Sequence, residues 1–307
     1  MKFMSIQEAY GRKFVRQKRI KELKYHALGS CVHIGKISPG CITCYRVDSY
    51  RENFNSGVKC NLRCVYCTTR SDAGRDKVTT VIKSIGEVRK ELLQNSRRPD
   101  YNPSIYSFTG QGDTLVNIGF VSEVTKLIHN VTKHLKRKPW LYLYTNGILA
   151  DKEILLKLKD LGFDEIRFHL GASNFSNRVY KHMEIAVNYF KAITVETPAW
   201  PPHRKQLFKM LPIIEGIGVK HLNLGEIDLN ANNLRRVIKA LPKAKIYPCF
   251  ELHLYDGGLV YDIIEKVIEK KYSYSVLDCS CFTKLMQRGK ARRACFWDLK
   301  NLTDPAI

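Results

Sequence analysis

The sequence has no run of 18 apolar residues and no apolar stretch behind its first residues, Met-Lys-Phe-Met-Ser. A membrane-spanning helix needs about 20 mostly apolar residues and a secretory signal needs an apolar core, so we expect neither, and no membrane partner. The chain also lacks low-complexity tracts and internal repeats other than the strand–helix period described below. We therefore expect a cytoplasmic protein in a reducing setting, where disulfides are a poor explanation for the 10 cysteines.

Acidic residues are scarce relative to basic ones: 29 Asp and Glu stand against 51 Lys and Arg, a net charge of +22. The basic residues cluster at 12–24, 133–138 and 288–293. Such a field favours polyanionic partners such as RNA, but solvated basic helix faces would give the same count. The charge alone therefore does not identify the substrate.

Between residues 53 and 230, short β-branched or aromatic runs alternate with helical periods at a repeat of roughly 25–35 residues. One expected strand leads into Cys60. The other five cover residues 104–109, 140–145, 165–170, 192–197 and 221–226. Parallel strands of this kind need helices outside them and build their site at the strands' carboxyl ends. We predict an α/β fold, a partial (β/α)6 TIM-like barrel over 53–230. Residues 1–52 would add a basic helix, expected over 5–24, and a cysteine-rich loop, and 231–307 an extension packing on that loop.

Three cysteines lie close together in the sequence: Cys60, Cys64 and Cys67 have the spacing C-x3-C-x2-C, with Tyr66 before the third. A [4Fe–4S] cluster takes four ligands, so three thiolates leave one iron open to a reacting molecule. A structural zinc site would be closed, and no His-x3-5-His or second C-x2-C follows at the usual distance. The spacing favours an iron–sulfur site.

This loop, with Tyr66 as its aromatic residue, resembles the signature of the radical S-adenosylmethionine (SAM) enzymes. The resemblance implies a [4Fe–4S] cluster that binds SAM and cleaves it reductively, giving a 5′-deoxyadenosyl radical that abstracts hydrogen from a substrate. It also implies a partial (β/α)6 barrel, an oxidoreductase or transferase activity, and a reductase partner such as flavodoxin or ferredoxin. The flanks around Ser38–Cys44 and after Cys279 are similar to an uncharacterised prokaryotic group related to pyruvate formate-lyase activating enzymes.

Further polar residues stand at the expected strand ends. The turn Gly110-Gln-Gly-Asp113 occupies the place of the family's Gly-Gly-Glu-Pro-like turn in degenerate form, and its glycines and carboxylate could face SAM's ammonium group. Polar strand-end residues can also merely cap helices or form turns, and His169 is a weaker candidate of this kind. The cofactor-binding candidates are Tyr66, Gly110, Gly112, Asp113, Asn146, Glu196 and Glu226.

A second cysteine group, Cys31, Cys41 and Cys44, has the spacing C-x9-C-x2-C, and Cys279 or Cys281 could supply a fourth ligand if the C-terminal segment folds back. Four thiolates would close either a second [4Fe–4S] cluster or a structural zinc site, with buried thiols as the alternative. Cys249 stands apart; it could donate a hydrogen atom to a substrate radical or be a small buried hydrophobe.

The combined prediction is a radical SAM enzyme acting on a peptide or protein, by activation, methylation, epimerisation or cross-linking. RNA modification and a small-metabolite substrate are alternatives within the same chemistry. A non-enzymatic, zinc-stabilised nucleic-acid-binding protein and an electron-transfer iron–sulfur protein are alternatives from other classes, distinguished by the absence of SAM cleavage.

Overall fold

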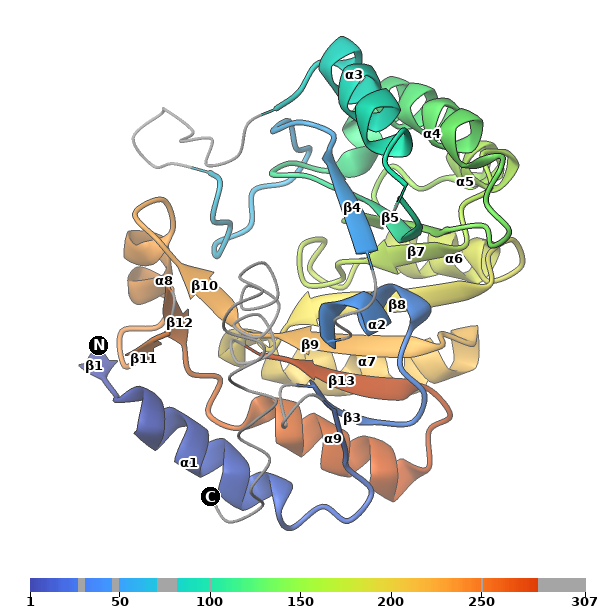
Figure 1. Cartoon of the computed structure of the whole chain (residues 1–307). Helices are drawn as coiled ribbons and strands as arrows, with labels where there is room; N and C mark the ends of the chain where they lie inside the picture. Colours follow the sequence, from blue (N-terminus) through green and yellow to red (C-terminus); the bar gives the residue numbers. More distant parts are fainter. Residues whose placement is uncertain (27–30, 46–49, 71–81, 100, 250, 281–307) are drawn as a thin grey trace.

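The computed structural model describes residues 1–26, 31–45, 50–70, 82–99, 101–249 and 251–280. In these ranges the strands form a nine-stranded sheet, ordered β2-β3-β13-β9-β8-β7-β6-β5-β4, and a four-stranded sheet, ordered β1-β11-β12-β10 (Figure 1). No helix of the described ranges is long and apolar enough to cross a membrane.

The large sheet contains the predicted barrel strands. Neighbouring strands from β4 to β9 all pair in parallel. Their bounds are β4 Tyr50–Asn55, β5 Pro103–Thr109, β6 Trp140–Thr145, β7 Glu165–Phe168, β8 Ala192–Pro198 and β9 His221–Gly225. A seventh parallel strand, β13 (Ser275–Cys279), pairs with β9, and β3 (Cys31–Ile34) and β2 (Lys24–His26) extend that edge in antiparallel fashion. The partial (β/α)6 barrel is confirmed, with the C-terminal segment adding a strand beside the N-terminal one.

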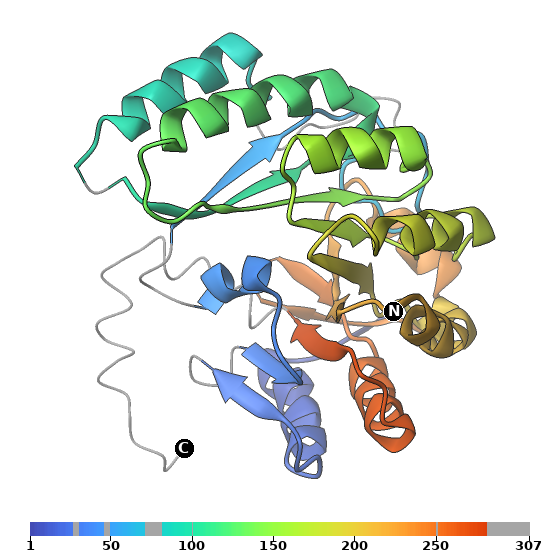
Figure 2. The same cartoon turned by 90° about the vertical axis from the view of Figure 1, so that its right-hand side faces the viewer.

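Helices follow the strands along the outer face of the large sheet (Figure 2). They are α3 Ile85–Ser96, α4 Ile118–Thr132, α5 Lys152–Asp160, α6 Asn177–Ala186, α7 Arg204–Ile217 and α9 Leu259–Lys270, with the short turns η1 Thr114–Asn117 and η2 Pro201–His203. α3 begins at Ile85, where Ser84 caps it in a capping box with Glu87; residues 71–81 lie outside the described residues. The N-terminal helix α1, Ile6–Gln17, also ends earlier than the predicted residue 24.

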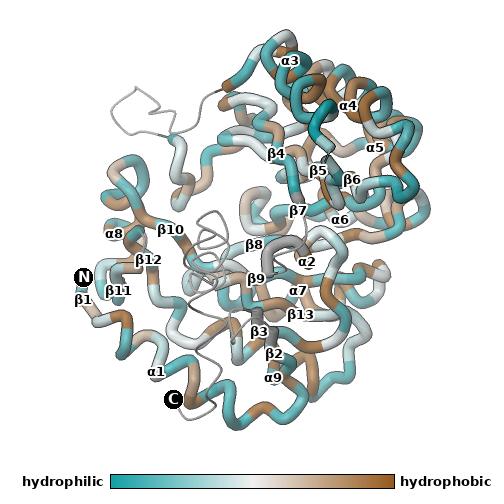
Figure 3. The backbone as a smooth tube through the Cα atoms, in the orientation of Figure 1, coloured by the Kyte–Doolittle hydropathy of each residue, from teal (hydrophilic) through white to brown (hydrophobic). Residues whose placement is uncertain are grey.

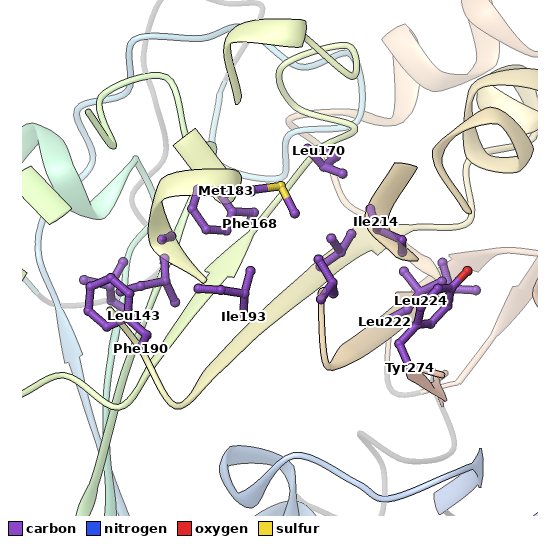
Figure 4. Packing of buried hydrophobic residues seen from close by; sticks show 14 of the residues in the cluster. Leu143, Phe168, Leu170, Met183, Phe190, Ile193, Ile214, Leu222, Leu224 and Tyr274 are labelled. Atoms are coloured by element: carbon purple, nitrogen blue, oxygen red, sulfur yellow. The ribbon is translucent and has the colours of Figure 1, made fainter. Parts of the chain in front are cut away.

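The main apolar core lies between the sheet and these helices. Alternate strand residues such as Leu143, Phe168 and Ile193 are almost completely buried on this side, and Met183 of α6 lies against Phe168 (Figure 4). Hydrophilic and hydrophobic residues alternate along the helices, as expected for elements with one buried face (Figure 3). Each large side chain buried here stabilises the fold by about 1.5–3 kcal/mol.

The other face of the same strands is polar, because side chains alternate along a strand. Arg167 Nε donates to Glu165 Oε1 over 2.9 Å, and the Thr194 hydroxyl donates to the same oxygen over 2.6 Å. The short helix α2, Pro39–Tyr45, enters this interior: the Ser38 hydroxyl donates to Glu165 Oε2 over 2.7 Å. A Cβ on Gly40 would lie 2.3 Å from Arg167 Nη2, so only glycine allows this approach. The N-terminal segment therefore fills the barrel interior.

The small sheet stands beside α8 (Leu234–Ala240) at the left of Figure 1. Its strands are β1 Lys2–Phe3, β10 Ile227–Leu229, β11 Lys245–Pro248 and β12 Leu252–Leu254. Its apolar face packs with Val237 of α8 and with Tyr66 of the cysteine loop. The small sheet thus supports the loop from the side opposite the barrel.

Candidate functional site

A cavity of about 900 Å³ opens where the strands of the barrel end, bounded by the cysteine loop, the turn after β5 and strand β10. Ligand sites in parallel α/β folds form at this end of the strands. The predicted site residues that line it are Cys60, Cys64, Tyr66, Cys67, Gly110, Gly112, Asp113, Asn146, His169, Glu196, Glu226 and Cys279. The structure therefore brings together residues that are up to 219 positions apart in the sequence, from Cys60 to Cys279.

Cys60, Cys64 and Cys67 carry free thiols on one wall of this cavity. Burial, and then the charges of Cys67 and Cys60, raise the pKa of the Cys64 thiol to about 12. Burial likewise raises the pKa of Cys60. Thiolates are the ligands of iron–sulfur clusters, and these three thiols line one cavity, so the donor set fits such a cluster.

The described residues contain no group of three or more His, Cys, Asp or Glu side chains that could hold a single metal ion. A mononuclear zinc site needs each sulfur about 2.3 Å from one metal. In a four-iron cluster each thiolate binds a different iron, so the ligands stand farther apart.

The glycine turn after β5 packs against the chain that leads into Cys60. Gly112 N–H donates to Gly57 O over 3.1 Å and Asp113 N–H to Lys59 O over 2.9 Å. A Cβ on Gly112 would lie 2.0 Å from Lys59 O, so only glycine fits there. The Thr69 hydroxyl donates to Gln111 O over 2.6 Å, which ties the far end of the loop to the same turn. The turn therefore shapes the cysteine loop as well as lining the cavity.

Asp113 and Asn146 join this turn to the end of β6. One Asp113 oxygen accepts from Asn146 N–H over 2.6 Å, the other accepts from Leu115 N–H over 3.0 Å, and the Thr145 hydroxyl donates to both. Burial raises the pKa of Asp113. The Asn146 amide donates to Asn61 Oδ1 over 2.7 Å and lies 3.8 Å from Cys60 Sγ. Both side chains brace the loop, and the predicted role of Asp113 toward SAM stays a prediction.

The two strand-end glutamates differ in exposure. Glu196 has a side chain 25 % exposed and accepts from Arg167 Nη1 over 2.8 Å and from Asn223 Nδ2 over 3.0 Å. Glu226 has a fully buried side chain, paired with Lys13 of α1, and the Tyr247 hydroxyl donates to it over 2.6 Å. Each carboxylate is therefore paired with a buried basic side chain, Glu196 with Arg167 and Glu226 with Lys13.

Aromatic rings form another part of the wall. Tyr66 stacks on His169 with 5.8 Å between ring centroids and meets the edge of Trp200 at 5.7 Å. Burial, and then the charge of His203, lower the pKa of His169 to about 4, so its imidazole is neutral at physiological pH. The stacked rings of Tyr66 and His169 thus form an uncharged aromatic part of the cavity wall.

Several residues that complete the site were not predicted from the sequence. Arg63, Arg70 and Asp228 line the cavity, and Arg167 and Lys13 hold its glutamates. The alternation of Glu165 and Arg167 along one strand is a signal that both face the same side, and it could have indicated the polar interior. The sequence has no comparable signal for Lys13.

The second cysteine group is only partly described. Cys41 is buried, accepts from Asn223 Nδ2 over 3.3 Å, and belongs to an apolar cluster against which Cys279 packs. The backbones of Cys31, in β3, and Cys44, in α2, are placed, but their side chains lie outside the described residues. Cys249 follows β11 and packs with Met4 and Tyr247, and it is not among the described residues that line the cavity.

Comparison with known proteins identifies the core. Residues 54–197 match the radical SAM superfamily. A Methanocaldococcus jannaschii protein, provisionally described as a glycyl-radical enzyme activating enzyme, is 25 % identical over 222 residues, covering 66 % of this chain and 54 % of its own length. An uncharacterised protein of the same organism is 24 % identical over 170 residues, covering 50 % and 51 %. The chain thus spans about half the length of the curated relatives that it matches.

A solved structure described as native anSMEcpe with bound AdoMet, that is, SAM, has the same fold. It superposes with a TM-score of 0.52 at 14 % identity, covering 74 % of this chain and 64 % of that one. A likeness at this identity concerns the fold. Residues 54–197 thus match the radical SAM superfamily in sequence, and the core has the fold of this solved structure.

Proposed function

We propose that Cys60, Cys64 and Cys67 hold a [4Fe–4S] cluster, that SAM binds in the adjoining cavity, and that the enzyme acts on a peptide or protein. One observation carries the proposal: the three thiols share one cavity of about 900 Å³ with the polar ends of β6, β8 and β9. When bound, the cluster supplies the electron that cleaves SAM to a 5′-deoxyadenosyl radical. A cytoplasmic reductase such as flavodoxin or ferredoxin would deliver that electron.

The residues of the chain would bind and shield SAM. Gly110 and Gly112 let backbone carbonyls approach the cavity closely, and the exposed part of Glu196 can accept hydrogen bonds from a ribose or a substrate. The neutral rings of Tyr66 and His169 would give the adenine of SAM an uncharged aromatic surface on that side. Asn146 can donate to the Cys60 sulfur and so orient one cluster ligand.

A peptide or protein substrate is supported by two observations. The M. jannaschii relative is described as an activating enzyme, whose target is itself a protein. The cavity lies near the upper end of the roughly 300–1,000 Å³ typical of ligand pockets, which leaves room for a substrate side chain beside SAM. Activation, methylation, epimerisation and cross-linking all remain within this proposal.

We also propose that Cys31, Cys41, Cys44 and Cys279 hold a second [4Fe–4S] cluster or zinc. The packing of Cys279 against the cluster containing Cys41, and the antiparallel pairing of β3 with β13, support it. Asn223 donates to Cys41, as a partner of a thiolate ligand would. Because Cys279 lines the cavity, this second group would face the substrate space.

The test is anaerobic reconstitution with iron and sulfide counting and a dithionite-driven assay for 5′-deoxyadenosine. We expect about eight irons in the wild type, and about four each in Cys60/Cys64/Cys67→Ala and Cys41/Cys44→Ala. SAM cleavage should disappear only in the first variant. Zinc in place of iron, without 5′-deoxyadenosine, would leave the zinc-stabilised nucleic-acid-binding protein as the better explanation.

RNA is the second candidate substrate, and the net charge of +22 favours it. The logarithm of an RNA affinity should then fall linearly with the logarithm of salt concentration, with a slope of about −0.7 per phosphate contact. A flat salt dependence would remove this candidate and leave the peptide or protein.

A further inference from the structure

Three asparagines at the start of α8 donate hydrogen bonds to the backbone of the cysteine loop. Asn230 Nδ2 and Asn232 Nδ2 donate to Thr68 O over 3.0 and 2.8 Å. Asn233 Nδ2 donates to Tyr66 O over 3.0 Å. All three asparagines are therefore directed at carbonyls within two residues of Cys67, a proposed cluster ligand.

Arg236, one turn farther along α8, binds three more carbonyls of the same loop. Its Nε donates to Val65 O over 3.0 Å, and its Nη2 donates to Cys67 O over 2.8 Å and to Arg70 O over 2.9 Å. The planar guanidinium presents its donors in a fixed geometry, so one side chain fixes three carbonyls relative to one another.

The loop has little backbone structure of its own to replace these contacts. Among the described residues from 61 to 70, one backbone hydrogen bond is internal to the loop, from Cys67 N–H to Cys64 O over 3.3 Å. Five of the six carbonyls from residue 65 to residue 70 accept from Asn230, Asn232, Asn233 or Arg236. The backbone carbonyls of residues 65–70 are thus held mainly by these four side chains.

The donors are themselves held rigidly. Asn233 is fully buried, its Nδ2 also donates to Asp228 O over 2.8 Å, and its Oδ1 accepts from Asn230 N–H over 2.9 Å. Tyr66 of the loop and Val237 of α8 share one apolar cluster with the small sheet. Side chains locked by packing and by other hydrogen bonds are the kind that can position a ligand set.

We propose that Asn230, Asn232, Asn233 and Arg236 are positioning residues that hold the cysteine loop in the shape that receives the cluster; we call them the loop clamp. The inference rests on the proposed function, because it takes Cys60, Cys64 and Cys67 as the ligands. In a trans peptide the carbonyl and the next N–H point in opposite directions. Fixing Cys67 O toward Arg236 therefore turns the N–H of Thr68 away from α8. The clamp sets where the loop's amide dipoles point, and such outer contacts tune iron–sulfur clusters.

Arg236→Met, compared with Arg235→Met, tests the clamp, because Arg235 is the exposed neighbour on the same helix. After anaerobic reconstitution we measure iron and sulfide per chain, the paramagnetic resonance of the reduced cluster with and without SAM, and its reduction potential. Arg236→Met should hold the cluster roughly tenfold more weakly than wild type, with an altered spectrum, whereas Arg235→Met should match wild type. Lysine carries its donors on one ammonium nitrogen, so Arg236→Lys should give a cluster content and spectrum between those of Arg236→Met and wild type.

Hydrogen exchange of amides 61–70 in the metal-free protein gives a readout that does not depend on the cluster. We expect fast exchange in Arg236→Met and wild-type exchange in Arg235→Met. Circular dichroism checks folding, and Asn232→Ala, which removes one contact, is the milder variant if Arg236→Met does not fold.

The outcomes separate the clamp from the proposed function. Equal iron content, spectra and loop exchange in the Arg236 and Arg235 variants would overturn the clamp. A wild-type protein that binds no iron would overturn the proposed function instead. Hydrogen exchange of amides 61–70 would then still test whether the loop clamp orders the loop. Equal exchange in the Arg236 and Arg235 variants would overturn that claim as well.

Discussion

The ammonium group of Lys13 on α1 lies 2.5 Å from Glu226 Oε1 at the edge of the cavity, with both side chains buried. Burial opposes the charge on Lys13, but the nearby Asp278 and Glu226 raise its pKa well above the ordinary value, so it stays cationic. The N-terminal helix thus supplies the countercharge for a carboxylate of the candidate site.

Lys13→Met should destabilise the fold by about 3–5 kcal/mol, because it leaves the buried Glu226 carboxylate without its cation. Urea unfolding measures the loss, with the exposed Lys21→Met as the control. Adding Glu226→Leu to Lys13→Met should recover much of the stability. A loss below about 1 kcal/mol, as for an exposed pair, would contradict this assignment.

Gly112→Ala should prevent cluster binding. Its Cβ would lie 2.0 Å from the backbone oxygen of Lys59, so the chain leading into Cys60 must move. Iron counting after reconstitution is the measurement. The matched control is Gly119→Ala, since a Cβ at Gly119 in α4 meets nothing within 4 Å and should stabilise the helix by up to about 1 kcal/mol. Normal iron content in Gly112→Ala would show that the turn does not shape the loop.

His169 should make stability fall as the pH decreases from about 6.5 to about 4. Its folded-state pKa is about 4, below its ordinary value of 6.5, chiefly because of burial. The unfolded chain therefore binds the proton first on acidification, and the contribution, full above pH 6.5, is lost through this window, amounting to roughly 3 kcal/mol. His169→Asn retains an acceptor for Ala172 N–H and should show a flatter dependence in thermal unfolding at pH 4.5 and 7. Parallel curves for the two proteins would refute this.

Strands such as β6 and β8 could be predicted because each is a short β-branched or aromatic run of the right length. β4 is mostly polar and ends at Asn55, before the Cys60 to which it was expected to lead. The run Trp140–Thr145 coincides with β6, and Ala192–Thr197 is one residue shorter than β8. α3 begins at Ile85 although the apolar Ile82 precedes it, because the capping box of Ser84 and Glu87 satisfies the first N–H groups of the helix there. Local capping outweighed periodicity there.

The parts of the candidate site that come from a sequence motif could be predicted. The charged residues that reach the site from distant parts of the chain could not. The cysteine spacing and the polar strand ends indicated one cavity, because parallel strands end on the same side. Lys13 and Glu226 are 213 residues apart, and no sequence pattern pairs a lysine on an amphipathic helix with a strand-end glutamate. The asparagines of the loop clamp likewise cannot be distinguished from ordinary loop residues in the sequence, because the carbonyls that they bind belong to a distant segment.

Asp113→Asn should separate a bracing role from a role in binding SAM. The carboxylate accepts from two backbone N–H groups, of Asn146 and Leu115, and from the Thr145 hydroxyl, whereas an amide has only one acceptor oxygen. One buried donor is therefore left unsatisfied, at a cost of about 1–3 kcal/mol in the free energy of unfolding, measurable without SAM. Ser122→Ala, which removes a hydroxyl bonded within α4, serves as the control for a generic polar loss. An unfolding free energy equal to wild type, together with weakened SAM binding in calorimetry, would show instead that the carboxylate is kept for the ligand.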